Sequence, residues 1–296
     1  MHTATYYIDL LLSGITVGSL YALIAIGYTM VYGILRLINF AHGDIFMMAG
    51  FFMVYTSASM PMAVALPVVL VMTVLLGVLI ERAAYKPLRS APRMSVMISA
   101  IGVSYLLQNL ATYITGGLAR PYPEIAILKK TLAVGTLSVK VITIVTPLLT
   151  VLLVVALVLF INHTKTGMAM RAVSKDYEIA RVMGVNIDRV ISITFIIGSS
   201  LAAIGAFMWG VRYPGITPLL GVMPGLKCFI AAVIGGIGNI KGAVIGGFIL
   251  GLGEVLIVAF FPQLSGYRDA FAFIVLIIIL FYKPTGLLGE KTTEKV

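Results

Sequence analysis

The stretch ITIVTPLLTVLLVVALVLFI (residues 142–161) holds twenty consecutive residues without a charged side chain. Crossing the hydrocarbon core of a bilayer as a helix takes about 20 apolar residues, so this stretch is long enough to cross once. Three further runs, near residues 61–80, 94–116 and 190–211, also lack Asp, Glu, Lys and Arg. The repeated pattern predicts an all-α, polytopic transmembrane helical bundle.

The composition of the chain supports this class. Hydrophobic residues make up 60% of the 296 residues and charged residues 11%, with a mean hydropathy of +1.08. Soluble domains are usually about 45–50% apolar and about 25% charged. The net charge of +10 does not indicate a nucleic-acid partner, because the basic residues gather in short loops between apolar runs. Membrane lipid is therefore the expected surrounding. Cys228 is the only cysteine, which excludes an intrachain disulfide.

The apolar runs predict eight or nine spans in a single transmembrane domain that covers residues 1–296. Two regions leave the number open. The first run, about residues 8–35, carries four glycines, which are expected to bend or break it. Gly14 and Gly18 also form a small-xxx-small pair that permits close helix approach. The glycine-rich run that follows residue 225 is divided by GGIGNIKG (235–242), so one of its pieces is expected to be re-entrant or broken.

The loops predict the orientation. ERAAYKPLRSAPR (81–93) carries four basic residues against one acid, which places it on the cytoplasmic side. Alternation of the spans then gives an external N-terminus and a cytoplasmic C-terminus. Residues 116–140 form an external loop in this scheme, and their prolines and β-branched residues are typical of a hairpin. Three lysines in that loop oppose the charge rule.

The most polar segment, residues 162–189, is too polar to span a membrane. Its centre, about residues 168–183, has an imperfect amphipathic helical pattern, and Gly184 followed by Asn186 is typical of a helix stop. We expect a helix at the cytoplasmic surface that docks into a groove of a soluble partner and transmits its movement. The alternative is an ordinary solvated loop.

Known catalytic motifs do not occur in the sequence. There is no G-x-x-x-x-G-K-[ST], no H-E-x-x-H and no G-x-S-x-G, and the three histidines are widely separated. The sequence therefore predicts that the chain is not an enzyme, and that it carries no metal site and no cofactor of its own.

The stretch INFAHGDIFMMAG (38–50) places Asn39, His42 and Asp44 beside an apolar run. Three interpretations compete. They are a proton relay, a role in a substrate pathway or gate, and a helix start at the cytoplasmic interface where Asp44 complements the first turn. The relay is disfavoured because few titratable groups lie inside the other spans. Glu254, well within an apolar run, is expected either to bond a neighbouring helix or to line a pathway.

A short internal echo links this stretch to IGNIKGAVIGGFILG (237–251). Both have an apolar lead-in and an asparagine, and both have a glycine at their sixth residue, so that Gly43 would correspond to Gly242. Transporters often contain internal repeats with broken helices at corresponding positions. Chance similarity between two low-complexity stretches is the alternative.

Three segments resemble one family. GYTMVYGILRLINFAHGDIFMMAG (27–50), DYEIARVMGVNIDRVISITFIIGSSLAAIGA (176–206) and GLKCFIAAVIGGIGNIKGAVIGGFILGLGE (225–254) follow one another in the order of these segments in the branched-chain amino acid ABC transporter permeases. The short, tail-free form resembles the H-type subunit of the permease pair. The resemblance implies a permease subunit in the bacterial inner membrane that imports branched-chain or similar amino acids.

The same resemblance implies partners. They are a second related permease, two soluble ABC ATPase subunits that hydrolyse ATP, and an extracytoplasmic substrate-binding protein. The coupling loop of such importers follows the pattern E-A-A-x-x-x-G; Glu178, Ala180 and Gly184 match it, whereas Ile179 replaces an alanine. The residues expected to contact the ATPases are Asp176, Glu178, Ala180, Arg181 and Gly184. The alternative is an autonomous secondary transporter or channel for small polar solutes such as amino acids, amides or urea.

Polar side chains and free helix ends would have to meet the charged ends of an amino acid. The candidates for a substrate pathway are Asn39, His42, Asp44, Gln108, Asn109, Asn239 and Glu254. The candidates for a hinge or helix break are Gly43, Gly235, Gly236, Gly238 and Gly242.

Overall fold

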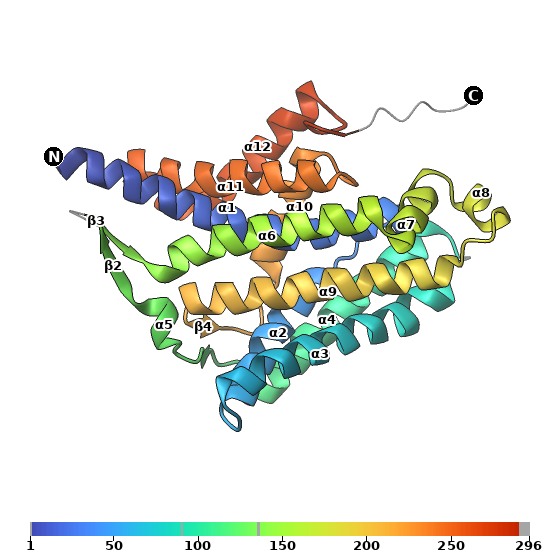
Figure 1. Cartoon of the computed structure of the whole chain (residues 1–296), viewed down its shortest axis with the longest axis horizontal. Helices are drawn as coiled ribbons and strands as arrows, with labels where there is room; N and C mark the ends of the chain where they lie inside the picture. The colour runs from blue at the N-terminus through green and yellow to red at the C-terminus, as the bar shows by residue number, and fades with distance from the viewer. Residues whose placement is uncertain (1, 90, 135–136, 290–296) are drawn as a thin grey trace.

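The computed structural model describes residues 2–89, 91–134 and 137–289, and its regular structure is almost entirely helical, which confirms the all-α prediction. Within this part of the chain, seven helices are long and apolar enough to cross a membrane. Figure 1 shows the long helices of the bundle running along its longest axis. They are α1 (His2–Leu35), α3 (Met62–Ile80), α4 (Arg93–Thr115), α6 (Val141–His163), α9 (Ile187–Arg212), α11 (Ile240–Phe260) and α12 (Arg268–Tyr282), with α3 and α12 lengthened by adjoining turns.

Helix α1 forms the centre of the bundle as one continuous helix of 34 residues, so the expected bend or break is absent. None of its glycines has a positive φ angle. These glycines allow close helix packing instead. A Cβ at Gly14 would lie 2.8 Å from the Leu252 side chain, and one at Gly18 would lie 2.9 Å from Phe248 Cα. The missing side chains thus let α11 approach α1 closely, as small residues do between membrane helices.

Two short helices start inside the bundle. Helix α2 (His42–Ser57) follows a non-helical return after α1, and α10 (Val222–Gly235) follows a similar return after α9. Their first turns touch, since a Cβ on Gly43 would lie 2.4 Å from the Gly221 carbonyl oxygen. The predicted eight or nine spans therefore comprise, in the described residues, seven long helices and these two helices of half length. The predicted division at 235–242 is confirmed, because α10 ends at Gly235.

The two halves of the bundle have related but opposite arrangements. In each, a long helix is followed by a short helix and two more long helices, α1 to α4 and α9 to α12. Helices α1 and α9 run antiparallel in Figure 1, with Gly27 beside Gly198 and Ile24 beside Gly205. Helix α1 packs on α11, and α9 packs on α3, where Gly77 meets Ser199.

This arrangement corrects the expected echo between Gly43 and Gly242. Gly43 starts α2 and touches the start of α10, whereas Gly242 lies in α11 and packs on Gly235. The repeat therefore relates α2 to α10 and not to α11. Both glycines nevertheless lie at close helix contacts.

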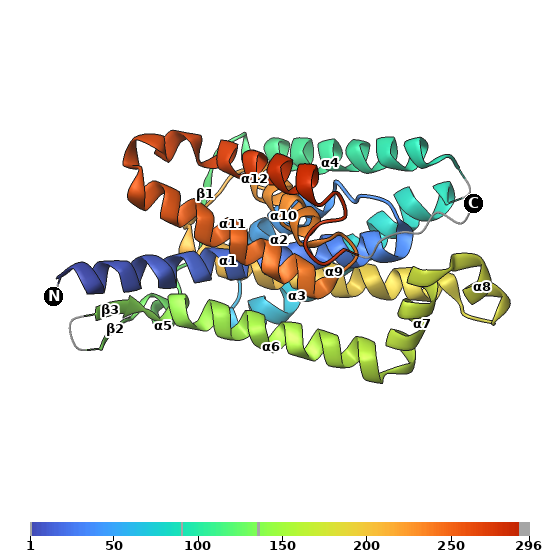
Figure 2. The same ribbon diagram turned by 90° about the horizontal axis from the view of Figure 1, so that it is seen from above.

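The non-helical and short elements lie at the two ends of the bundle (Figures 1 and 2). The β2–β3 end carries the N-terminal part of α1, and its predicted hairpin is confirmed because β2 (Thr131–Val134) pairs antiparallel with β3 (Leu137–Lys140). The α7–α8 end is opposite. The remaining short elements are the π-helix η1 (Glu81–Tyr85), η2 (Lys86–Leu88), β1 (Arg120–Pro121), α5 (Ala126–Lys129), α7 (Lys165–Lys175), α8 (Tyr177–Val182), β4 (Gly215–Ile216) and η3 (Pro262–Tyr267), with β1 paired to β4.

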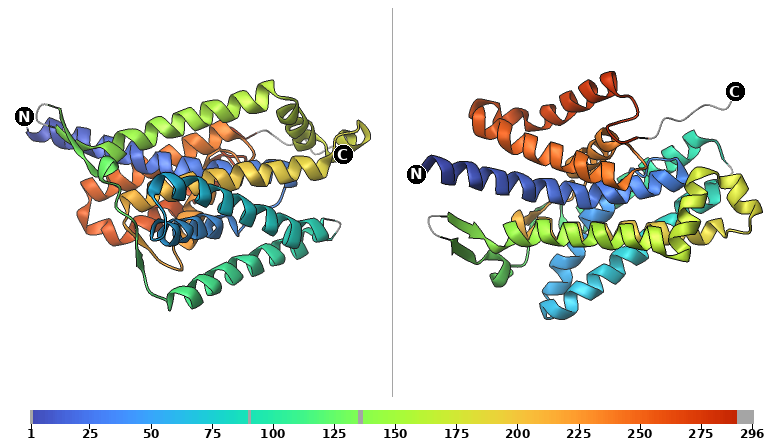
Figure 3. Two further views of the ribbon diagram at one scale, coloured as in Figure 1. Left: turned by 60° about the horizontal axis from the view of Figure 1, so that its bottom comes forward. Right: turned by 45° about the horizontal axis from the view of Figure 1, so that its top comes forward.

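The peripheral helices have the apolar surface expected of a membrane protein. Helices α4, α6 and α12 lie at the periphery (Figures 2 and 3) and expose many apolar side chains, as lipid-facing helices do.

The prediction of a single amphipathic helix over residues 168–183 is wrong. Asp176 breaks it, because its extended backbone ends α7 and its side chain accepts hydrogen bonds from the first N–H groups of α8.

Candidate functional site

The first polar cluster lies where α2 begins. The Asn39 side-chain oxygen accepts hydrogen bonds from the Ala41 N–H, at 3.1 Å, and from the Tyr85 hydroxyl, at 2.8 Å. The Ala41 contact is an Asx turn, which redirects the chain from the end of α1 into α2. The Asn39 side-chain nitrogen is buried and has no partner among the described residues. Asn39 thus fixes the return before α2 and retains one unused donor.

His42 fills a notch between the two antiparallel long helices. A Cβ on Gly27 of α1 would lie 2.3 Å from its Nε2 atom, and one on Gly198 of α9 would lie 3.7 Å from its Cε1 atom. The Tyr28 ring stands edge-on at 4.7 Å. His42 is buried, and Nε2 finds no hydrogen-bond partner in the described part of the chain. Glycine at position 27 is needed to leave room for this imidazole, whereas a Cβ on Gly198 would make only an ordinary contact with it.

Asp44 is buried in the first turn of α2. Gly27, which lies against the ring of the neighbouring His42, precedes the end of α1 by eight residues, or roughly 12 Å of helix. The Asp44 carboxylate accepts a hydrogen bond from the Ser104 hydroxyl, and Gln108 Nε2 donates to its two oxygens at 3.2 and 3.3 Å. It does not cap its own helix by a side-chain hydrogen bond. Its negative charge lies beside Gly221 at the start of α10, where a helix dipole favours an anion.

The structure brings Gln108 to this cluster but separates two other candidates from it. Asn109 is exposed on α4 and donates to the Tyr105 carbonyl. Asn239 caps α11 by accepting from the Gly242 N–H at 3.2 Å, and its side-chain nitrogen donates to the Leu288 carbonyl at 2.9 Å. Asn239 therefore ties the α10–α11 corner to the chain after α12.

The glycine candidates occupy two kinds of position. Gly236 and Gly238 have φ angles of 108° and 94° and form the left-handed corner between α10 and α11. Gly235 and Gly242 face each other across that corner, where a Cβ on Gly235 would lie 1.9 Å from the Gly242 carbonyl oxygen. Gly43 lies inside α2, after the interruption at residues 36–41.

A second polar cluster surrounds Glu254, which is buried in α11. Its carboxylate pairs with Lys227 Nζ at 2.7 Å and accepts a hydrogen bond from the Tyr21 hydroxyl at 2.9 Å. Lys227 also pairs with Asp269, at 2.6 Å. Sequence reasoning considered Glu254 alone and missed Lys227. The signal was a lysine only five residues into the apolar sequence of α10, where a buried cation needs a partner.

A third ionic cluster lies at the α7–α8 end. Arg89 contacts both Glu81 of η1 and Asp188 in the first turn of α9. Glu81 is fully buried and also accepts a hydrogen bond from the Ser192 hydroxyl at 3.0 Å. Lys86 pairs with Asp188 at 3.0 Å on the surface. This cluster connects the start of α9, just after α8, to the end of α3.

The predicted coupling residues lie on or beside α8. Glu178 and Arg181 are exposed, Ala180 is buried, and Gly184 has a φ angle of 82°, which ends the helix as expected. Val182 and Met183 are 85% and 77% exposed. An apolar surface of this kind outside the apolar bundle is typical of a protein contact.

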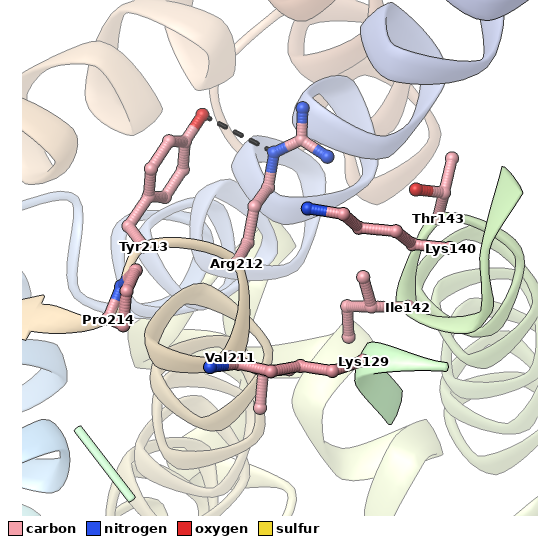
Figure 4. A pocket seen from close by; sticks show the side chains of 8 residues that line it. All are labelled: Lys129, Lys140, Ile142, Thr143, Val211, Arg212, Tyr213 and Pro214. Carbon is pink, nitrogen blue, oxygen red and sulfur yellow. Dashed lines mark hydrogen bonds between the residues drawn. The ribbon is translucent and has the colours of Figure 1, made fainter. Parts of the chain in front are cut away.

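A cavity of about 470 Å³ lies at the opposite, β2–β3 end (Figure 4). Its lining residues include Lys129, Lys140 and Arg212 but no carboxylate. Arg212 Nε donates to the Tyr213 hydroxyl at 3.4 Å. The cavity is thus lined by three cations. Two of them, Lys129 and Lys140, are among the lysines whose predicted external position opposes the positive-inside rule.

Comparison with known proteins assigns the family. The profile described as "Branched-chain amino acid transport system / permease component" matches residues 10–280. The chain belongs to this permease family. It is 40% identical over 307 aligned residues to the high-affinity branched-chain amino acid transport system permease protein LivH of Escherichia coli K12, covering 98% of each chain. It is 39% identical to BraD, the corresponding permease protein of Pseudomonas aeruginosa, again with 98% of each chain covered.

A more distant relative is the probable branched-chain amino acid transport permease protein LivH of Methanocaldococcus jannaschii, 27% identical over 92% of this chain and 89% of the relative. No solved structure gives a significant match. The family and the seven long apolar helices make this permease a multi-pass membrane protein and a transport subunit, which is the expected class.

Proposed function

We propose that the chain is one permease subunit of an ATP-driven importer of branched-chain amino acids in the bacterial inner membrane. The family and the LivH and BraD relatives support the substrate class. In this proposal the whole chain, residues 1–296, is one permease domain, and it has no cofactor or metal of its own. ATP is hydrolysed by two separate ATPase subunits.

The observation that carries the proposal is the exposed helix α8. It presents Val182 and Met183 to the surroundings, is capped by Asp176, and connects directly to the long helix α9. A short apolar surface joined by a short connection to a membrane helix is suited to docking an ATPase and passing on its movement. The α7–α8 end, which also carries the basic loop 81–93, then faces the cytoplasm. The N-terminus lies outside.

The other partners follow from this orientation. A second, related permease completes the translocation pathway, and an extracytoplasmic binding protein delivers the amino acid to the β2–β3 end. The basic cavity of Figure 4 lies at that end.

The test is uptake of radiolabelled leucine by proteoliposomes that contain the full assembly. Replacing residues 168–184 with a flexible linker of equal length should abolish ATP-dependent uptake while insertion and permease pairing persist. Normal uptake by this variant would overturn the coupling proposal. Uptake by the purified chain alone, without ATP, would instead support the autonomous transporter or channel.

A further inference from the structure

A second cavity, of about 530 Å³, lies among α1, α9, α10, α11 and α12 and shares Arg212 with the cavity of Figure 4. Its lining changes with depth. Tyr6 and Asp269 are about half exposed, whereas Tyr21, Lys227 and Glu254 are at most 7% exposed. The cavity therefore leads from the surface at the β2–β3 end to the buried Lys227–Glu254 ion pair.

The charges that line this cavity are not balanced. Its basic side chains are Arg212, Lys227 and Arg268, and its carboxylates are Glu254 and Asp269. Both carboxylates share Lys227, at 2.7 and 2.6 Å. Arg212 donates to the Ser13 hydroxyl at 2.7 Å but has no carboxylate partner among the described residues. A guanidinium in this position is available for an anionic group, which it can bind through two N–H donors.

A second unused donor lines the same wall. Trp209 precedes Arg212 by three residues, so both side chains lie on one face of α9. The Trp209 indole N–H is buried and has no acceptor in the described residues. A buried donor without an acceptor is costly, so it points to an acceptor that arrives with a ligand.

The remaining walls fit the other parts of an amino acid. Glu254 and Asp269 provide carboxylate oxygens, which attract an ammonium group. The lining also includes aliphatic residues, which suit a branched hydrocarbon side chain. The aliphatic residues include Val17 of α1 and Val255 and Val258 of α11.

We propose that this cavity binds the transported amino acid as its zwitterion. The carboxylate meets Arg212 and the Trp209 indole N–H, and the ammonium group meets Glu254 and Asp269. The aliphatic side chain packs on the valines. The proposal rests on the import of branched-chain amino acids proposed above and names the place where the substrate is held on its way through this subunit.

Fluorescence offers a direct test because Trp209 is the only tryptophan of the chain. The purified full-length chain in detergent micelles is titrated with L-leucine, with 4-methylpentanoate, which lacks the ammonium group, and with 3-methylbutylamine, which lacks the carboxylate. We expect a saturable change with leucine and at least about tenfold weaker binding of both analogues, because each lacks one of the two charged groups by which leucine is held. No saturable change with leucine, or equal responses to all three compounds, would overturn the proposal.

Variants of the lining residues test whether leucine binds in this cavity. Arg212→Gln should weaken leucine binding by about tenfold or more, as loss of a charged hydrogen bond does. Lys140→Gln is the control, because Lys140 lines only the neighbouring cavity. Val258→Phe should fill the aliphatic region and weaken binding of leucine more than binding of alanine. Equal binding by Arg212→Gln and Lys140→Gln, with both variants folded by circular dichroism, would refute the site.

Uptake by the full assembly separates this proposal from the proposed import. If import is wrong and the cavity is right, leucine changes the fluorescence but ATP drives no uptake. If the cavity is wrong and import is right, Arg212→Gln and Val258→Phe import leucine at the wild-type rate.

Discussion

The Arg36 guanidinium donates a hydrogen bond of 2.6 Å to the backbone carbonyl of Ser174, which links the end of α1 to α7. Arg36 is the one described non-glycine residue with a positive φ angle, 54°. It directly precedes the return that carries Asn39 and then His42. The segment next to the proposed ATPase contact is therefore tied to the start of the half-length helix α2.

Two substitutions of Arg36 should separate strain from contact. Arg36→Ala keeps the left-handed backbone and loses the hydrogen bond, whereas Arg36→Gly loses the bond but relieves strain of about 1 kcal/mol. We expect Arg36→Ala to lower the free energy of unfolding more than Arg36→Gly, and both to reduce ATP-coupled uptake. Chemical unfolding and uptake assays measure the two effects. Full uptake by both variants would show that the α1–α7 link does not transmit movement.

The contact between α2 and α10 should tolerate no side chain at Gly43. A Cβ there would lie 2.4 Å from the Gly221 carbonyl oxygen, so Gly43→Ala must separate the two helices. We expect a loss of about 1–3 kcal/mol in the free energy of unfolding, as in other overpacked interiors. Gly102→Ala is the control, because a Cβ at Gly102 of α4 meets nothing within 4 Å. Equal stability of the two variants would contradict the close contact.

The Arg89 cluster predicts a non-additive result. Arg89→Gln leaves the buried Glu81 carboxylate without its cation, which typically costs about 3–5 kcal/mol. Adding Glu81→Gln removes the unpaired charge and should recover much of this loss. Lys86→Gln is the control, since its pair with Asp188 is exposed and such pairs contribute at most about 1 kcal/mol. Unfolding of the wild type, Arg89→Gln, Glu81→Gln and the double variant gives a double-mutant cycle, and Lys86→Gln is measured beside it as the control.

The roles of His42 and Asp44 can be tested by removing charge while keeping hydrogen bonds. Asp44→Asn can still accept from Ser104 and Gln108. We expect Asp44→Asn and His42→Gln to import leucine with an unchanged profile from about pH 5 to about pH 8, the range in which a histidine relay would titrate. Loss of pH dependence in either variant would instead support a proton relay.

Local patterns predicted much of the fold. Uncharged runs located the long helices, and turn residues located the β2–β3 hairpin and the α10–α11 corner. The depth of α2 was not predictable, because it depends on Gly27 and Gly221, which are distant from it in sequence and matter only through contact. The break at Asp176 was missed because the amphipathic pattern continues across it. The partner of Glu254 was missed because a lysine in an apolar run was not considered as its counterion.

The inverted relation between α1–α4 and α9–α12 bears on the direction of transport. Two identical halves in opposite orientations would present the same chemistry to both sides of a membrane. A symmetric path of this kind favours neither import nor export. The buried Lys227–Glu254 pair lies on α10 and α11, whereas α2 and α3 carry no lysine and no arginine. The two halves of this subunit therefore differ in charge at corresponding helices, which makes the bundle asymmetric.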